Sequence, residues 1–136
     1  MEFKKVAMSR PELAPELRRF VVTNVPSVPY LEAILLLRAQ PQRYWTAADM
    51  ARRLYVSESA AASLLDAAVA AGVAATAPVA QAGVGYQPSS PELADLLDRL
   101  ATHYAHDVVT VATLIHKQSD TRVRRFADAF VWRKES

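Results

Sequence analysis

Two short helices separated by only three residues constrain the fold of this chain more than any other feature. Thr46 and Asp49 have the spacing of a capping box, so a helix is predicted over residues 47–54. The following Tyr55-Val56-Ser57 leaves room only for a tight turn, and Ser57 can cap a second helix over residues 58–71. The centre of the chain is therefore predicted to be a helix, a tight turn and a helix.

The helical period is lost after the second of these helices. Gly72 stands where a helix is expected to end in a left-handed residue. Residues 73–77 are partly β-branched, residues 78–85 have the composition of a loop, and Tyr86-Gln87 precedes Pro88. Two short strands joined by a loop are expected here, which predicts a small β-hairpin.

Further helices are predicted on both sides of this centre. Before it, helices are expected over residues 11–23 and 29–39. After it, apolar residues alternate at spacings of three and four, which predicts a single helix from Pro91 to Gln118 of roughly 37 Å. A last helix is expected after Asp120 or Thr121.

The order of helix, helix, tight turn, helix and hairpin from Pro29 to Pro88 resembles the winged helix-turn-helix domains of bacterial transcription regulators. The matching segments are Trp45-Thr46-Ala47-Ala48-Asp49-Met50-Ala51 as second helix, Tyr55-Val56-Ser57 as turn, and Ser57 to Gly72-Val73 as third helix and exit. The resemblance covers a little under half of the chain.

The expected fold is mainly α, with a winged helix-turn-helix core, a small β-hairpin wing, one N-terminal helix and two C-terminal helices. The expected organisation is an N-terminal helical arm (residues 1–28), the winged helix-turn-helix (residues 29–90) and C-terminal helices for dimerisation or interaction (residues 91–136).

The resemblance implies a cytoplasmic, bacterial transcription regulator that binds double-stranded DNA as a homodimer. In such domains the third helix enters the major groove and the wing reaches the flanking backbone or minor groove. Arg52 and Arg53 are expected to contact phosphates. The candidate DNA-binding residues are Arg43, Thr46, Arg52, Arg53, Ser57, Ser59 and Ser63.

The residues of the third helix and the wing favour an alternative. The forward face of the third helix offers Glu58, alanines and serines, none of which makes the bidentate contacts that read bases. The wing, residues 78–85, contains no Lys or Arg, and affinity for DNA scales with the phosphates neutralised. The alternative is a winged helix that acts as a protein–protein interaction module and does not bind DNA directly.

The helix predicted from Pro91 is too long for a small core to cover, so part of it is expected to pack against another chain. A compatible expectation is that the helices at residues 11–23 and 121–134 fold back over it. The candidate dimer or partner residues are Leu97, Leu100, Tyr104, Val108, Val111, Ile115, Phe126, Phe130 and Trp132.

A basic segment at the C-terminus is a further candidate contact, either with an acidic partner or as a solvated face. Its charged residues are Lys117, Arg122, Arg124, Arg125, Arg133 and Lys134.

Other functions are disfavoured by composition. The net charge is only +2, and the absence of cysteine excludes disulfides and thiolate metal sites. No catalytic motif is present, so an enzyme is not expected and no cofactor is implied. His103 and His106 match no established metal-site spacing, so no metal site is predicted. The start of the chain lacks the apolar region of a secretory signal, and no apolar stretch is long enough to span a membrane.

Overall fold

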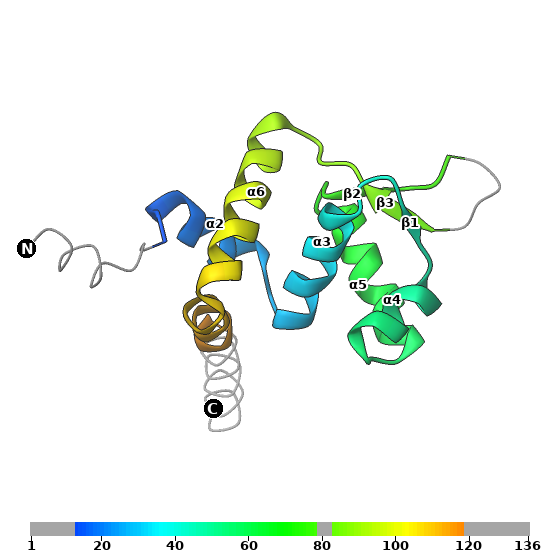
Figure 1. The fold of residues 1–136 in the computed structure, drawn as a ribbon, viewed down its shortest axis with the longest axis horizontal. Coiled ribbons are helices and arrows are strands. Elements are labelled where there is room, and N and C mark those ends of the chain that lie inside the picture. Colours follow the sequence, from blue (N-terminus) through cyan, green and yellow to red (C-terminus); the bar gives the residue numbers. More distant parts are fainter. Residues whose placement is uncertain (1–12, 79–82, 119–136) are drawn as a thin grey trace, which may run out of the picture.

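The computed structural model describes residues 13–78 and 83–118 and is mainly helical, with a small three-stranded antiparallel sheet. Figure 1 shows the elements in chain order. They are α2 (Pro15–Asn24), α3 (Val28–Ala39), β1 (Tyr44–Trp45), α4 (Ala47–Leu54), α5 (Glu58–Ala70), β2 (Ala74–Thr76), β3 (Val84–Tyr86) and α6 (Pro91–His106), followed by a helical segment at residues 108–118.

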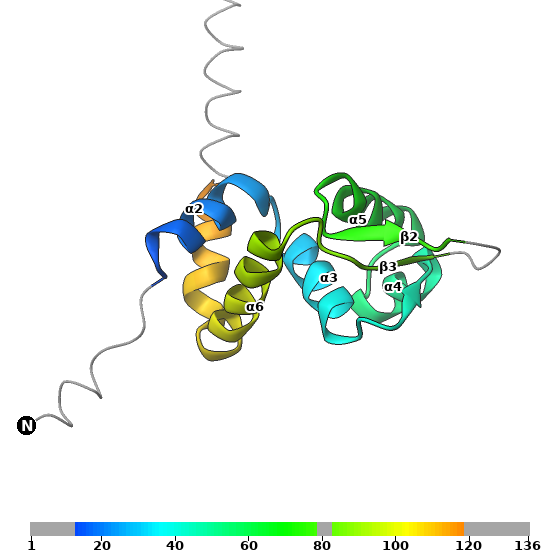
Figure 2. The same cartoon turned by 90° about the horizontal axis from the view of Figure 1, so that it is seen from above.

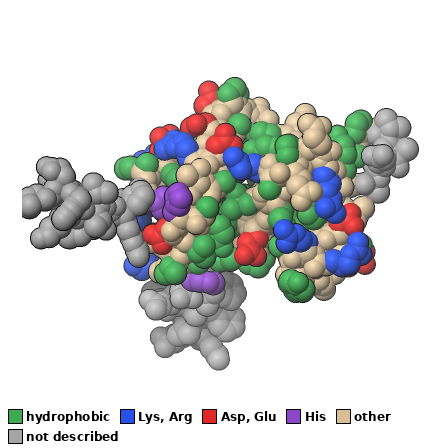
Figure 3. Space-filling model, in the orientation of Figure 1, with side chains coloured by type: hydrophobic (Ala, Val, Ile, Leu, Met, Phe, Trp, Pro, Cys, Tyr) green, Lys and Arg blue, Asp and Glu red, His purple; other side chains and the backbone are tan. Residues whose placement is uncertain are grey.

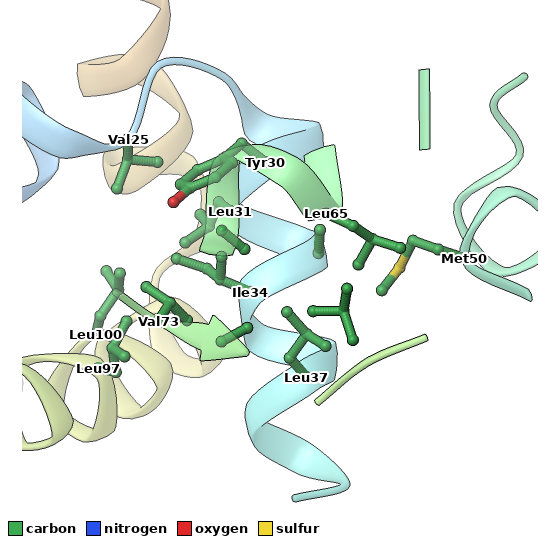
Figure 4. Close-up of a cluster of buried hydrophobic side chains, with 14 of the residues drawn as sticks. Val25, Tyr30, Leu31, Ile34, Leu37, Met50, Leu65, Val73, Leu97 and Leu100 are labelled. Carbon is green, nitrogen blue, oxygen red and sulfur yellow. The ribbon is translucent and has the colours of Figure 1, made fainter. Parts of the chain in front are cut away.

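Helix α3 lies at the centre of the molecule (Figures 1 and 2). The sheet, α4 and α5 pack on one side of it, and α2 and α6 lie on the other. In the core, Ile34 and Leu37 of α3 lie between Met50 on α4 and Leu97 on α6 (Figure 4). Apolar residues on most sides of α3, where Glu32 and Arg38 are the two charged residues, explain this central position, because a helix with a broad apolar surface must be covered on more than one side.

The predicted β-hairpin is confirmed. Strands β2 and β3 pair antiparallel, with Thr76 opposite Val84, and residues 79–82 between them lie outside the described residues. Strand β1 pairs with the other edge of β3, which gives the order β1-β3-β2. At Gly85 a Cβ atom would lie 2.8 Å from the ring of Tyr44, so a residue without a side chain lets β1 approach β3 closely.

The predicted helix boundaries in the centre of the chain are confirmed by the cap geometry. The Thr46 hydroxyl accepts a hydrogen bond from the Asp49 backbone N–H at 3.1 Å, and the Asp49 carboxylate accepts one from the Thr46 N–H at 3.4 Å. The Ser57 hydroxyl accepts from the Ala60 N–H at 3.0 Å. Gly72 has φ +80°, the left-handed conformation expected after α5.

The prediction of one continuous helix from Pro91 to Gln118 is wrong. Helix α6 ends at His106, and Asp107 is non-helical at φ −149° and ψ 72°. The Asp107 carboxylate accepts hydrogen bonds from the Thr110 backbone N–H at 3.2 Å and from the Thr110 hydroxyl at 2.6 Å, so it caps the segment at residues 108–118. That segment turns away from α6 and is seen nearly end-on in Figure 1 (orange). The helix predicted after Asp120 lies outside the described residues.

Candidate nucleic-acid interface

Three of the candidate DNA-binding residues surround one carboxylate at the start of α4. The Arg52 guanidinium lies 2.7 Å from the Asp49 carboxylate, and Arg43 lies 3.7 Å from it. Arg43 also stacks over the buried ring of Trp45, with 3.7 Å between the guanidinium carbon and the ring centroid. Thr46 joins the group through the capping box. The short segment 43–52 thus gathers two cations around one anion.

Asp49 reduces the positive charge that this group offers to a phosphate. The backbone N–H of Thr46 lowers the pKa of Asp49 most, followed by the Thr46 side chain, Arg43 and Arg52. Asp49 is therefore ionised at neutral pH, and Arg43 and Arg52 share its charge. Arg53 is exposed beside Arg52 in the last turn of α4. The sequence predicts Arg43, Arg52 and Arg53 as candidate DNA contacts but not the pairing of the first two with Asp49.

Helix α5 presents its outward face with short side chains. Ser59 and Ser63 are exposed four residues apart, whereas the Ser57 hydroxyl is engaged in the cap. Glu58 and Asp66 are exposed on the same helix. The helix carries no Lys, Arg, Asn or Gln, so its outward face has no side chain for bidentate contact with a base.

Tyr55, which sequence reasoning passed over, is the most exposed large apolar residue at this end of the molecule. It occupies the turn between α4 and α5, with φ 60° and ψ 46°, and its side chain is 94% exposed. A left-handed tyrosine at a helix C-terminus is unusual, since glycine or asparagine is preferred there. The sequence does hold a signal for this: a bulky tyrosine stands in the turn between two capped helices, where glycine or asparagine is expected.

Figure 3 shows Lys and Arg side chains gathered at the end of the molecule where α4 lies, with acidic side chains beside them. Arg43, Arg52, Arg53, Tyr55 and Ser59 form the part of this end that could meet a phosphate backbone, and we call them the α4–α5 surface. It combines hydroxyl groups with a modest excess of positive charge.

The candidate dimer residues do not form one surface in the structure. Leu97, Leu100, Val111 and Ile115 are fully buried in the core of the single chain, and Tyr104 is half-buried. Val108 is 48% exposed, and its neighbour Val109, which sequence reasoning did not single out, is 73% exposed. Phe126, Phe130 and Trp132 lie outside the described residues, as do all the basic C-terminal residues except Lys117.

Among residues 13–78 and 83–118, no group of three His, Cys, Asp or Glu side chains is placed to hold a metal ion. Within the same residues, no single helix has the length and apolar composition to cross a membrane. Helices α2 and α3 reach the required length and apolar composition only when they are taken together, and this pair is bent by 112° at the break between them.

Comparisons with protein-family models, with curated proteins and with solved structures found no match to this chain.

Proposed function

We propose that this chain is a winged helix-turn-helix protein of the transcription-regulator type that contacts double-stranded DNA as a homodimer. The observation that carries the proposal is the order α3, β1, α4, α5, β2 and β3 with the sheet order β1-β3-β2. In a winged helix, α5 would be the recognition helix and the β2–β3 hairpin the wing. The α4–α5 surface then faces the duplex.

The charges of the α4–α5 surface support contact with the phosphate backbone more than reading of bases. Among the described residues, the α4–α5 surface offers three arginines per copy to the duplex, so this surface should contribute a slope of about −3 per copy to the fall of the logarithm of the binding constant with the logarithm of salt concentration. Serine hydroxyls and the Tyr55 hydroxyl add neutral donors to phosphate. Discrimination between duplex sequences should be small, because α5 lacks bidentate donors.

The test is fluorescence polarisation with a labelled duplex of mixed sequence, titrated at several salt concentrations. Arg52→Gln with Arg53→Gln should reduce the steepness of the salt slope by about two per copy and weaken binding at low salt. The matched control is Arg18→Gln with Arg19→Gln, which removes the same charge from exposed positions on α2 at the opposite end of the molecule (Figures 1 and 2). Equal losses in both pairs would contradict contact through the α4–α5 surface.

A second candidate function is a winged helix that binds another protein through α5. The observation that favours it is the exposed run of small and acidic residues on α5, including Ala60, Ser63, Asp66 and Ala67. Small side chains let another helix approach closely, and the acidic residues oppose a phosphate backbone.

One substitution separates the two candidates. Ser63→Arg places a long cation on the outward face of α5. It should strengthen duplex binding in the first case, because a phosphate contact is added. In the second case it should block close approach of a partner, and neither form of the protein should bind the duplex at low salt.

A further inference from the structure

A pocket of about 300 Å³ lies between α2, α3, the start of α6 and the segment that joins α5 to β2. Its volume is at the lower end of the range of about 300–1,000 Å³ found for small-molecule sites. None of the residues of the α4–α5 surface lines it. It is therefore a separate feature, and its interpretation does not depend on the proposed contact with DNA.

The walls of the pocket are mainly apolar. Phe20 comes from α2, Ile34 from α3, Val73 from the start of the hairpin, and Leu93 and Leu96 from α6. Ile34 and Val73 are fully buried in the core, so this side of the pocket is fixed by packing. Binding of an apolar molecule of matching size is favourable, because it removes the apolar surface of the molecule and of these side chains from water.

Tyr30 supplies a polar group to the pocket. It lines the pocket and is only 3% exposed. Within the part of the chain that the structure describes, the Tyr30 backbone N–H donates to the Ser27 hydroxyl, and burial rather than a hydrogen bond sets the environment of its own hydroxyl. Burial raises the pKa of Tyr30, so the hydroxyl is protonated at neutral pH and can both donate and accept. Figure 4 shows the Tyr30 ring directed toward the side of the core where Val25 lies.

The charge around the pocket limits what can bind. Among the described residues that line the pocket, Glu92 is the only one charged at neutral pH, and none is Lys, Arg or His. The N-terminus of α6 also faces it, but a helix end carries only about half a positive charge, less than the full charge of a carboxylate. The pocket therefore disfavours an anionic ligand.

We propose that this pocket binds a small, mainly apolar organic molecule with one hydrogen-bonding group, either neutral or carrying an amino group. The apolar body lies against Phe20, Leu93 and Leu96, and its polar group bonds the Tyr30 hydroxyl. Because the walls belong to elements on both sides of α3, the bound molecule stabilises the arrangement of α2 and α6 against the rest of the fold.

The experiment uses three probes with the same ring and nearly the same chain: 2-phenylethanol, 2-phenylethylamine and phenylacetate. Each is titrated into the full chain up to about 10 mM by ligand-observed NMR, with thermal unfolding as a second measurement. We expect the alcohol and the amine to bind and to raise the Tm, and phenylacetate to bind at least about tenfold more weakly. Tyr30→Phe, which removes only the hydroxyl, should weaken binding of the alcohol about fivefold, as one lost hydrogen bond does.

A pair of variants separates the pocket from the remaining surface. Ala71→Phe fills the pocket from an exposed lining position and should abolish binding of both probes. Ala67→Phe adds the same ring one turn earlier on α5, outside the pocket, and should leave binding unchanged. Circular dichroism verifies that each variant is folded.

Four results would overturn the proposal. The first is that neither the alcohol nor the amine binds by 10 mM, and the second is that phenylacetate binds as tightly as they do. The third is that Ala71→Phe, folded as judged by circular dichroism, binds the probes like Ala67→Phe. A Tyr30→Phe variant with a changed Tm but unchanged affinity would also overturn it, because the hydroxyl would then be structural only.

Discussion

At Tyr55 the backbone is left-handed and the side chain is 94% exposed. The left-handed conformation costs an L-residue about 1–2 kcal/mol relative to its favoured conformations. Because the Tyr55 ring is almost entirely in water, its burial offsets little of this conformational cost. Neither backbone preference nor packing therefore explains a tyrosine at this position, whereas the proposed contact with DNA at the α4–α5 surface would.

Tyr55→Gly should raise the free energy of unfolding by about 0.5–1 kcal/mol, because relief of the left-handed backbone exceeds the greater entropy of glycine in the unfolded chain. Urea unfolding measures this change. The control is Ala67→Gly, at an exposed position inside α5, which should lose about 1 kcal/mol. Tyr55→Gly should also weaken duplex binding. A loss of stability equal to that of Ala67→Gly would show that the Tyr55 ring stabilises the fold.

The carboxylate of Asp49 gives the fold a dependence on acid. Its pKa is lowered in the folded chain from the ordinary value of 3.8, chiefly by the Thr46 backbone N–H. The stabilisation is therefore fully present above about pH 4 and is lost as the pH falls through the lower folded pKa. Asp49→Asn lacks this titration, so the stability difference between wild type and variant should shrink from pH 6 to pH 2.5 in urea unfolding.

Asp66→Asn is the matched control for Asp49→Asn, because it removes one negative charge from an exposed position on α5. The difference in the free energy of unfolding between Asp66→Asn and wild type should change less with pH. If the two variants follow the same pH dependence, the capping interaction of Asp49 is not the source of the effect.

At the scale of elements, the helix ends predicted correctly from the sequence depend on local signals within about four residues. The Thr46–Asp49 capping box, the Ser57 cap and the left-handed Gly72 are of this kind, and all three are present. Strand β1 was missed because it has two residues and pairs with β3 about forty residues later. The pocket was also invisible in the sequence, because four separate segments supply its walls.

The break in the predicted helix at Asp107 shows where periodicity misleads. The apolar stripe continues across the break, since Leu100 before it and Val111 after it are both buried in the same core. A stripe that continues across a bend has the same spacing as one on a straight helix. The local signal was Asp107 three residues before Thr110, the spacing of a helix cap.

Asp107→Ala should lower the free energy of unfolding by about 1 kcal/mol, the usual effect of removing an N-cap side chain. Helix 108–118 begins at this cap, so the loss should be accompanied by reduced helical circular dichroism. Asp66→Ala, which removes the same charge from the middle of α5, should cost less. Equal losses would mean that the bonds to Thr110 contribute nothing measurable.

At the scale of the whole molecule, one chain already covers most of the stripe that suggested a dimer. Leu97, Leu100, Val111 and Ile115 are buried in the same core cluster as residues of α2 and α3. Helix α6 contacts α2, which agrees with the expectation that the N-terminal helix folds back over the stripe. The large apolar side chains left exposed on this side are Val108 and Val109, at the start of the segment 108–118. Among the described residues, Val108 and Val109 are therefore the large apolar side chains on this side that remain available to the proposed homodimer.

Two substitutions separate a core role from an interface role. Val108→Lys with Val109→Lys should convert the proposed homodimer to a monomer in light scattering while each chain stays folded, because both side chains are exposed. Leu97→Ala should instead lower the free energy of unfolding by about 2–5 kcal/mol, because it opens a cavity inside a single chain. If the double variant remains a dimer at micromolar concentration, the contact between copies lies elsewhere, and residues 119–136, with Phe126, Phe130 and Trp132, become the segment to test.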